Sequence, residues 1–288
     1  MTPIKVFYDR RQSVEKNKSF SPSAGKPQLV VDSWLNRGLN ISIERVLPVD
    51  REDFYLVHDR YHTDAVLDLR RSNGFNNTDP LIAKSLYWTN GSLLTAARYA
   101  LETGETTCSP TSGFHHAEHW RTLGFCTFNG LMIAAAKLKD TLPAGKKIGI
   151  LDIDMHYGNG TDQIIKQYNI THVKHYTFGG AETGSEGWLG APRAEEWLTR
   201  LPSIVEGFND CALVIYQAGA DPHKDDPFGG ALDNDQLRRR DRIVFRSLKK
   251  MNIPCVWNFA GGYQEPIQKV IDIHTSTLEE CLSVTENN

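Results

Sequence analysis

The sequence predicts an α/β protein, a single domain over residues 1–288 whose central, mostly parallel β-sheet is flanked by helices. Apolar, β-branched runs of strand length alternate with longer runs of helical periodicity, which is the order of parallel strands joined by helices. Three such strands end in small residues and a reactive side chain, at Asp154, Asp221 and Tyr263. Open α/β sheets bind ligands at the carboxyl ends of their strands, so we expect an active site where these ends meet.

Length and composition favour an ordinary globular protein. The chain of 288 residues is 40% hydrophobic and 23% charged, which suits one large soluble domain. A net charge of −3 gives no signature of binding to nucleic acid or to anionic membranes, so neither partner is expected. No apolar run approaches membrane-spanning length, and the N-terminus resembles a short strand rather than a signal peptide. The five scattered cysteines lack a CxxC pair and predict reduced thiols in a cytoplasmic protein.

The N-terminal part begins with that strand and continues with a polar surface loop over residues 10–26, rich in Ser and Pro. Loops of such length in compact domains are often functional. His58 and His62 flank the start of a helix and lack a carboxylate at ligand spacing, so we expect loop and cap residues rather than ligands. The other predicted elements are a helix over 29–39, a strand over 41–46, a helix from 63, turns over 73–80 and a long helix over 81–101.

The central stretch of the chain follows a buried strand predicted over residues 148–151. Asp152, Asp154 and His156 come at every second position after it. Period-two spacing in a strand places side chains on one face, so we expect all three together at the carboxyl end. Two carboxylates and an imidazole in a poorly solvated place need a counter-charge, which predicts a metal ion. Glycines then allow a sharp turn into a helix over 162–168.

The strand pattern recurs further along the chain. A strand over 213–217 passes through a small-residue turn to Asp221, which could complete a ligand set with Asp154 and His156. The strand over 254–259 ends in two glycines followed by Tyr263. The connecting elements are a strand over 173–176, a helix over 194–207, a charged helix over 233–251 and a final helix from 267 to about 281.

Two adjacent histidines, His115 and His116, lie in a glycine-bounded loop before an apolar helix over 131–138. If the loop bends, both rings can lie side by side over a site. The pair alone is equally compatible with an active site and with a surface position.

Together these motifs resemble the zinc-dependent deacetylases, the histone deacetylase and acetylpolyamine amidohydrolase superfamily with an arginase-like α/β fold. Each matching segment is weak alone, but five in the family's order are specific. The segments are Gly113-Phe114-His115-His116-Ala117, Gly124-Phe125-Cys126, residues 152–161, Gly219-Ala220-Asp221 and Gly261-Gly262-Tyr263.

The resemblance implies a set of catalytic roles. His115 and His116 would be the acid–base pair, with His116 nearer the attacking water and Asp152 supporting His115. Asn159 stands where some members have Asp, and an amide partner favours a neutral His116 that is ready to accept a proton. Tyr263 would donate to the developing oxyanion. One catalytic Zn²⁺ would be held by Asp154, His156 and Asp221.

The resemblance also implies a narrow tunnel for an acyl-lysine-like chain. Phe125, with Gly124, would form one wall, Phe228 would lie at the mouth, and Asp79 would bind substrate amides at the rim. An Asx turn is an equally good explanation of Asp79. The family's inner K⁺ site would fall at residues 173–174. The opposite wall of the tunnel could be formed by Tyr176, Phe178 or Trp188.

This chain also departs from the family pattern. Its N-terminal loop, residues 19–27, lacks the His-Pro-Glu sequence that many members carry, and Tyr157 replaces a second histidine. Residues 175–192 do not match the Phe-Phe-Pro-Gly stretch of the family.

We therefore expect hydrolysis of acetyl or other short acyl groups from lysine-like or polyamine amines. The partners would be an acetylated small molecule or an acetyl-lysine protein or peptide, and a homo-oligomer is left open. The alternatives are an arginase-like ureohydrolase with two metal ions, for which Asp225 and Asp226 are the nearest extra ligands, a Mg²⁺-dependent phosphohydrolase using Asp152 and Asp154, and a non-catalytic acyl-lysine-binding module.

Overall fold

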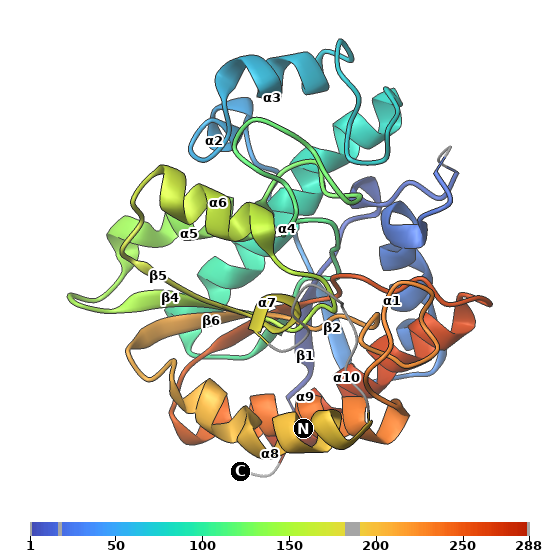
Figure 1. The fold of residues 1–288 in the computed structure, drawn as a ribbon, viewed down its shortest axis with the longest axis vertical. Coiled ribbons are helices and arrows are strands. Elements are labelled where there is room, and N and C mark those ends of the chain that lie inside the picture. Colours follow the sequence, from blue (N-terminus) through green and yellow to red (C-terminus); the bar gives the residue numbers. More distant parts are fainter. Residues whose placement is uncertain (1, 17–18, 182–190, 287–288) are drawn as a thin grey trace.

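The computed structural model describes residues 2–16, 19–181 and 191–286. Within them, a single sheet of seven parallel strands runs through the middle of the molecule, in the order β2-β1-β3-β7-β6-β4-β5 (Figure 1). The predicted α/β class and parallel sheet are confirmed. The strands are β1 (Ile4–Phe7), β2 (Ile41–Glu44), β3 (Thr107–Cys108), β4 (Lys147–Asp152), β5 (Val173–Thr177), β6 (Cys211–Gln217) and β7 (Cys255–Asn258).

Helices cover both faces of this sheet (Figure 1). One face packs against α4 (Pro80–Thr103), α5 (Gly130–Leu138) and α6 (Asn159–Gln167). The other packs against α1 (Lys26–Asn36), α8 (Ala191–Glu206), α9 (Asn234–Lys250) and α10 (Gln268–Glu286). The described residues also form the short helices α2 (Arg51–Phe54), α3 (Arg60–Leu67) and α7 (Phe178–Ala181), and 3₁₀ turns at residues 10–12, 22–24 and 139–141. None of the described helices is long and apolar enough to cross a membrane.

Strand β4 shows why the sequence forms this layered core. Ile148 and Ile150 belong to the core on the α4, α5 and α6 side, whereas Leu151 belongs to the core on the opposite side. This alternation follows from the two-residue period of a strand, and burial on both faces explains the continuous apolar run. All five cysteines are buried and free, as the sequence suggested.

The structure corrects the predicted N-terminal loop. Residues 10–26 contain two 3₁₀ turns, and α1 begins three residues earlier than the predicted helix, at Lys26 instead of residue 29. Lys26 is fully buried and its ammonium donates to the carbonyl oxygen of Ala260 at 2.7 Å. The loop was therefore wrongly predicted as a surface segment, because a buried partner far along the chain fixes its end.

Strand order brings the functional loops together. Strands β4, β6 and β7 are neighbours in the sheet, although β5 and several helices separate them in sequence. All are parallel, so their carboxyl ends meet at one edge. The loops that follow them carry the residues predicted to hold a metal and to stabilise an oxyanion.

Candidate active site

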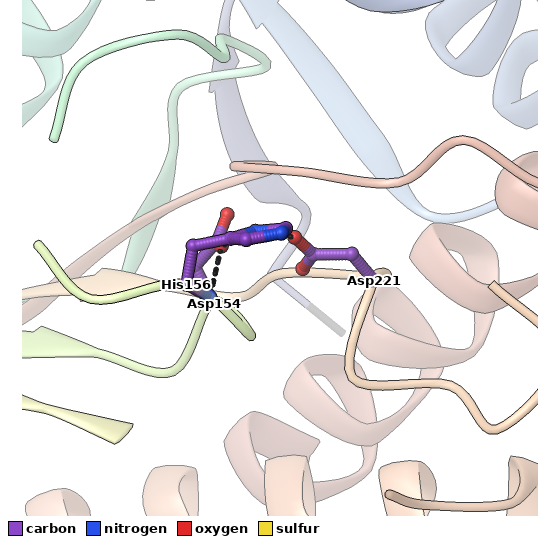
Figure 2. Close-up of side chains that lie close together, drawn as sticks. All are labelled: Asp154, His156 and Asp221. Carbon is purple, nitrogen blue, oxygen red and sulfur yellow. Dashed lines mark hydrogen bonds and ion pairs between the residues drawn. The ribbon is translucent and has the colours of Figure 1, made fainter. Parts of the chain in front are cut away.

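Asp154, His156 and Asp221 converge from the loops after β4 and β6 (Figure 2). The Nδ1 atom of His156 lies 3.1 Å from Oδ1 of Asp154 and 3.0 Å from Oδ2 of Asp221. Both aspartates are buried and His156 is partly buried. Because β4 ends at Asp152, Asp154 and His156 lie on a bend over residues 154–156, and the predicted strand alternation through His156 is wrong. The predicted convergence of the three side chains is nevertheless confirmed.

The backbone of Gly261, after β7, closes this cluster. Its N–H donates to Oδ2 of Asp154 at 2.8 Å. A Cβ atom at Gly261 would lie 2.2 Å from Oδ2 of Asp221 and 2.8 Å from Oδ2 of Asp154, closer than side-chain atoms can approach. Glycine is therefore required here, because any larger residue would displace the two carboxylates.

The chemistry of this donor set fits a divalent metal. Burial, together with the neighbouring Asp154, raises the pKa of Asp221 to about 7. Burial disfavours the imidazolium of His156, but the two carboxylates outweigh burial and raise its pKa to about 11. A cation is thus favoured between the carboxylates. One imidazole and two carboxylate ligands, with positions left for water and substrate, suit catalytic zinc.

His115 lies beside the cluster and is paired with the carboxylate of Asp152. Its Nδ1 atom lies 2.8 Å from Oδ2 of Asp152, and its Nε2 atom lies 3.7 Å from Oδ1 of Asp154. The side-chain amide of Gln217 donates to the other oxygen of Asp152 at 2.7 Å. Although burial disfavours the charged ring, the carboxylates of Asp152 and Asp154 raise the pKa of His115 to about 9. His115 is consequently cationic at neutral pH.

His116 is paired with the side-chain amide of Asn159, and its pKa is shifted in the opposite direction to that of His115. Its Nδ1 atom lies 2.6 Å from Oδ1 of Asn159. Burial and the neighbouring His115 lower the pKa of His116 to about 4, so its ring is neutral at neutral pH. Gly124 has a φ of 53°, and a Cβ atom there would lie 2.5 Å from Cδ2 of His116. The structure therefore places Gly124 against the histidine ring as well as along the cavity.

Tyr263 and the aromatic residues lie on the outer side of the cluster. A cavity of about 10 Å³ is lined by Tyr263, Phe125, Gly124, His115 and Asp154 among others. The backbone N–H of Tyr263 donates to Asp226 at 2.7 Å. Its ring centroid lies 5.7 Å from that of Phe125 and 5.2 Å from that of Phe228, so the three aromatic rings lie side by side.

Several predicted binding residues have other structural roles. Asp79 caps α4, where its carboxylate accepts from the N–H of Leu81 at 2.8 Å. Phe178 is fully buried against Trp197 and is not a tunnel wall. Tyr176 accepts a hydrogen bond from the indole of Trp197. The remaining candidate, Trp188, lies outside the described residues.

The K⁺ position at residues 173–174 stays a prediction. Thr177, rather than Val173 or Lys174, pairs with Asp152 in the sheet, and the ammonium of Lys174 lies 2.9 Å from Asp210. His175 of the same strand lies beside Asp152.

Sequence reasoning missed four residues near the site. His175 lies between Asp162, at 2.7 Å, and Asp152, at 3.9 Å, and these carboxylates raise its pKa despite burial. Glu118 accepts from the side-chain amide of Asn159 at 3.0 Å. No local pattern marks these contacts, although Glu118 follows the histidine pair closely. The other two are the buried Lys26 and the exposed Phe20, whose ring packs on Phe125 and Phe228.

Comparison with known proteins gives consistent results. The sequence-family model of the histone deacetylase domain matches residues 23–179 of this chain. A probable deacetylase of Methanothermobacter thermautotrophicus is 26% identical over 240 residues, covering 74% of this chain and 71% of that protein. Histone deacetylase 2 of Arabidopsis thaliana is 29% identical over 198 residues, covering 63% of this chain and 50% of that protein. The crystal structure of the HDA15 HD domain matches 99% of this chain and 91% of its own with a TM-score of 0.78, and at 20% identity this shows a shared fold.

Proposed function

This chain belongs to the histone deacetylase family, and we propose that it is a zinc-dependent amidohydrolase that removes acetyl or another short acyl group from a lysine-like or polyamine amine. Family membership indicates a deacetylase hydrolase acting on acetylated substrates. The observation that supports the finer proposal is the Asp154, His156 and Asp221 cluster, with a cationic and a neutral histidine beside it. Such a set offers a metal site, a proton acceptor and a fixed positive charge within one pocket.

Each residue of the site has a separate role in the proposed hydrolysis. A zinc ion bound by the cluster would lower the pKa of a water ligand to roughly 7 and polarise the amide carbonyl. Neutral His116 accepts a proton from the attacking water and returns it to the leaving nitrogen, so that water and amide become carboxylic acid and amine. Cationic His115 stabilises the negative charge that develops. The hydroxyl of Tyr263 donates to the amide oxygen as it becomes an oxyanion.

The alternatives have less support. Within the described residues, a single group of three or more potential metal ligands occurs, which disfavours a site for two metal ions. The carboxylate of Asp226 accepts from the backbone N–H groups of Tyr263 and Phe228 and so holds their loop. A phosphohydrolase would need a free carboxylate oxygen on Asp152, but both oxygens accept hydrogen bonds. An acyl-binding module would not require a neutral and a cationic histidine together.

Three aromatic side chains beside the metal-ligand cluster favour an uncharged acyl chain over a cationic one. The ring of Phe20 lies 5.1 Å from that of Phe125 and 6.0 Å from that of Phe228, and Phe20 is 74% exposed. These rings present apolar edges, whereas Glu182 and Glu186, which could also line the mouth, lie outside the described residues. We therefore propose that acetyl-lysine peptides are better substrates than acetylpolyamines.

Measuring acetate release tests this function. Purified protein, stripped with a chelator and reloaded with Zn²⁺, should release acetate from acetyl-lysine peptides and, with lower kcat/KM, from acetylpolyamines. The Asp225→Asn variant is the matched control for Asp221→Asn, because it changes a neighbouring carboxylate outside the cluster. Release that continues unchanged after chelation, or in Asp221→Asn, would contradict the proposed metal-dependent mechanism.

A further inference from the structure

Asn159 alone cannot decide which nitrogen of His116 carries the proton. A neutral imidazole has a hydrogen on one ring nitrogen only. The amide of Asn159 can turn its oxygen toward Nδ1 of His116 and accept, or turn its NH₂ group there and donate. Only the first arrangement places the hydrogen on Nδ1 and leaves Nε2 free to accept a proton from water. A group that fixes the amide would therefore fix the base.

Glu118 is placed to fix that amide. Its Oε1 atom accepts from Nδ2 of Asn159 at 3.0 Å, and the opposite face of the amide directs Oδ1 to His116 at 2.6 Å. An ionised carboxylate can only accept hydrogen bonds, so turning the amide over would set two oxygens against each other. Glu118 is only 7% exposed, which limits the screening of this interaction by water.

The carboxylate of Glu118 is itself held in position. Arg121 donates to both of its oxygens at 2.8 Å, a two-bond arrangement that fixes the plane of the group. The main chain of Glu118 is fixed as well, because its N–H donates to Arg121 at 3.0 Å and its carbonyl accepts from His58 at 2.9 Å. The carboxylate therefore meets the Asn159 amide in one orientation.

We propose that Glu118 is a positioning residue that selects the Nδ1–H tautomer of His116 by orienting the amide of Asn159. The proposal rests on the role of His116 as proton acceptor in the proposed function. It predicts that the identity of the hydrogen-bonding group at position 118, rather than the stability of the loop, determines the tautomer.

The variant Glu118→Gln tests the proposal with almost no change of shape. Its amide can either accept from Asn159 or donate to it, so the orientation of Asn159 is no longer decided. ¹⁵N NMR of histidine-labelled, zinc-loaded protein should show the Nδ1–H tautomer of His116 in the parent and a mixture in the variant. We expect kcat to fall about two- to tenfold with KM within about twofold, because a charge-assisted hydrogen bond shifts an orientation ratio by about tenfold or more.

Adding Asn159→Asp to the Glu118→Gln variant should restore the Nδ1–H tautomer of His116. The carboxylate then lies on the residue next to His116 and accepts from Nδ1–H, while the amide at position 118 donates to it, so the donor and acceptor pattern is restored. The Nδ1–H tautomer should return, and kcat should return toward the parent value at a pH above the His116 pKa, which the carboxylate at position 159 raises. Asn159→Asp with the native Glu118 should instead lower kcat, because it would place two carboxylates about 3 Å apart.

Glu195→Gln is the matched control. Glu195 also accepts from an arginine, Arg239, and from a side-chain amide, that of Gln236, but it lies on α8. It should change neither the tautomer nor kcat. An unchanged His116 tautomer in folded Glu118→Gln protein would overturn the proposal whether or not the protein is active. A shifted tautomer in Glu118→Gln, together with a zinc-loaded parent protein that is inactive toward every acylated amine, would instead support the orientation by Glu118 and refute the proposed function.

Discussion

Replacing Tyr263 by phenylalanine removes one oxygen atom and isolates the proposed oxyanion donor. The ring contacts with Phe125 and Phe228, at 5.7 and 5.2 Å between centroids, do not involve the hydroxyl. The backbone bond to Asp226 also remains. We therefore expect a change in the free energy of unfolding within about 0.5 kcal/mol, as for substitutions that disturb no packing.

The effect on the reaction should be much larger. Burial raises the pKa of Tyr263 above its ordinary value, so the phenol stays protonated and can donate throughout the neutral range. Loss of one oxyanion donor costs about 2.7–4 kcal/mol of transition-state stabilisation, which is about a hundred- to a thousandfold in kcat.

Steady-state kinetics on an acetyl-lysine peptide, with zinc content and thermal unfolding measured on the same preparation, separate these effects. Hydroxamate affinity should stay within about tenfold, because the interaction is stronger in the transition state than in the ground state. A fully metallated Tyr263→Phe enzyme with unchanged kcat would refute the assigned role.

Three further substitutions test other parts of the site. In the parent enzyme kcat/KM should rise as pH increases through the His116 pKa of about 4, because that ring must be neutral, and fall as pH rises through the His115 pKa of about 9, because that ring must stay protonated. Asp152→Asn should lower the His115 pKa toward the ordinary histidine value of 6.5, so that the alkaline fall in kcat/KM begins at lower pH. An unchanged alkaline fall would contradict the pairing of His115 with Asp152. Gly261→Ala should lose bound metal, since its Cβ would lie 2.2 Å from Oδ2 of Asp221, and metal analysis showing full occupancy would argue against that crowding. Phe228→Glu should raise kcat/KM for acetylpolyamines relative to acetyl-lysine peptides by about tenfold, because a carboxylate near a cation contributes on the order of 1–4 kcal/mol. An unchanged ratio would show that the mouth does not select by charge.

The parts of the site that lie at strand ends could be predicted from sequence. Asp154, Asp221 and Tyr263 each follow an apolar run, and parallel strands deliver such residues to one edge whatever the intervening helices do. The detailed prediction failed at His156, because β4 ends at Asp152 and the ligands lie on a bend. The two-residue strand β3 was missed, since so short a run leaves no detectable alternation.

The contacts that depend on loop packing could not be predicted. Lys26 reaches Ala260, and Glu118 reaches Asn159, across long stretches of chain with no local periodicity. His175 lies beside Asp152 because β4 and β5 are paired in one register, which the sequence does not specify. Phe20 belongs to a Ser- and Pro-rich loop, so its place over the site follows only from the folded ring contacts.

Metal analysis of the purified protein tests the central claim most directly. Because Asp154, His156 and Asp221 form one cluster of three potential ligands, we expect about one zinc ion per chain, with nitrogen and oxygen ligands by X-ray absorption. Asp154→Ala and Asp221→Ala should each lose that ion, while Asp225→Ala should keep it. Two ions per chain, or full retention of zinc in Asp221→Ala, would contradict the account.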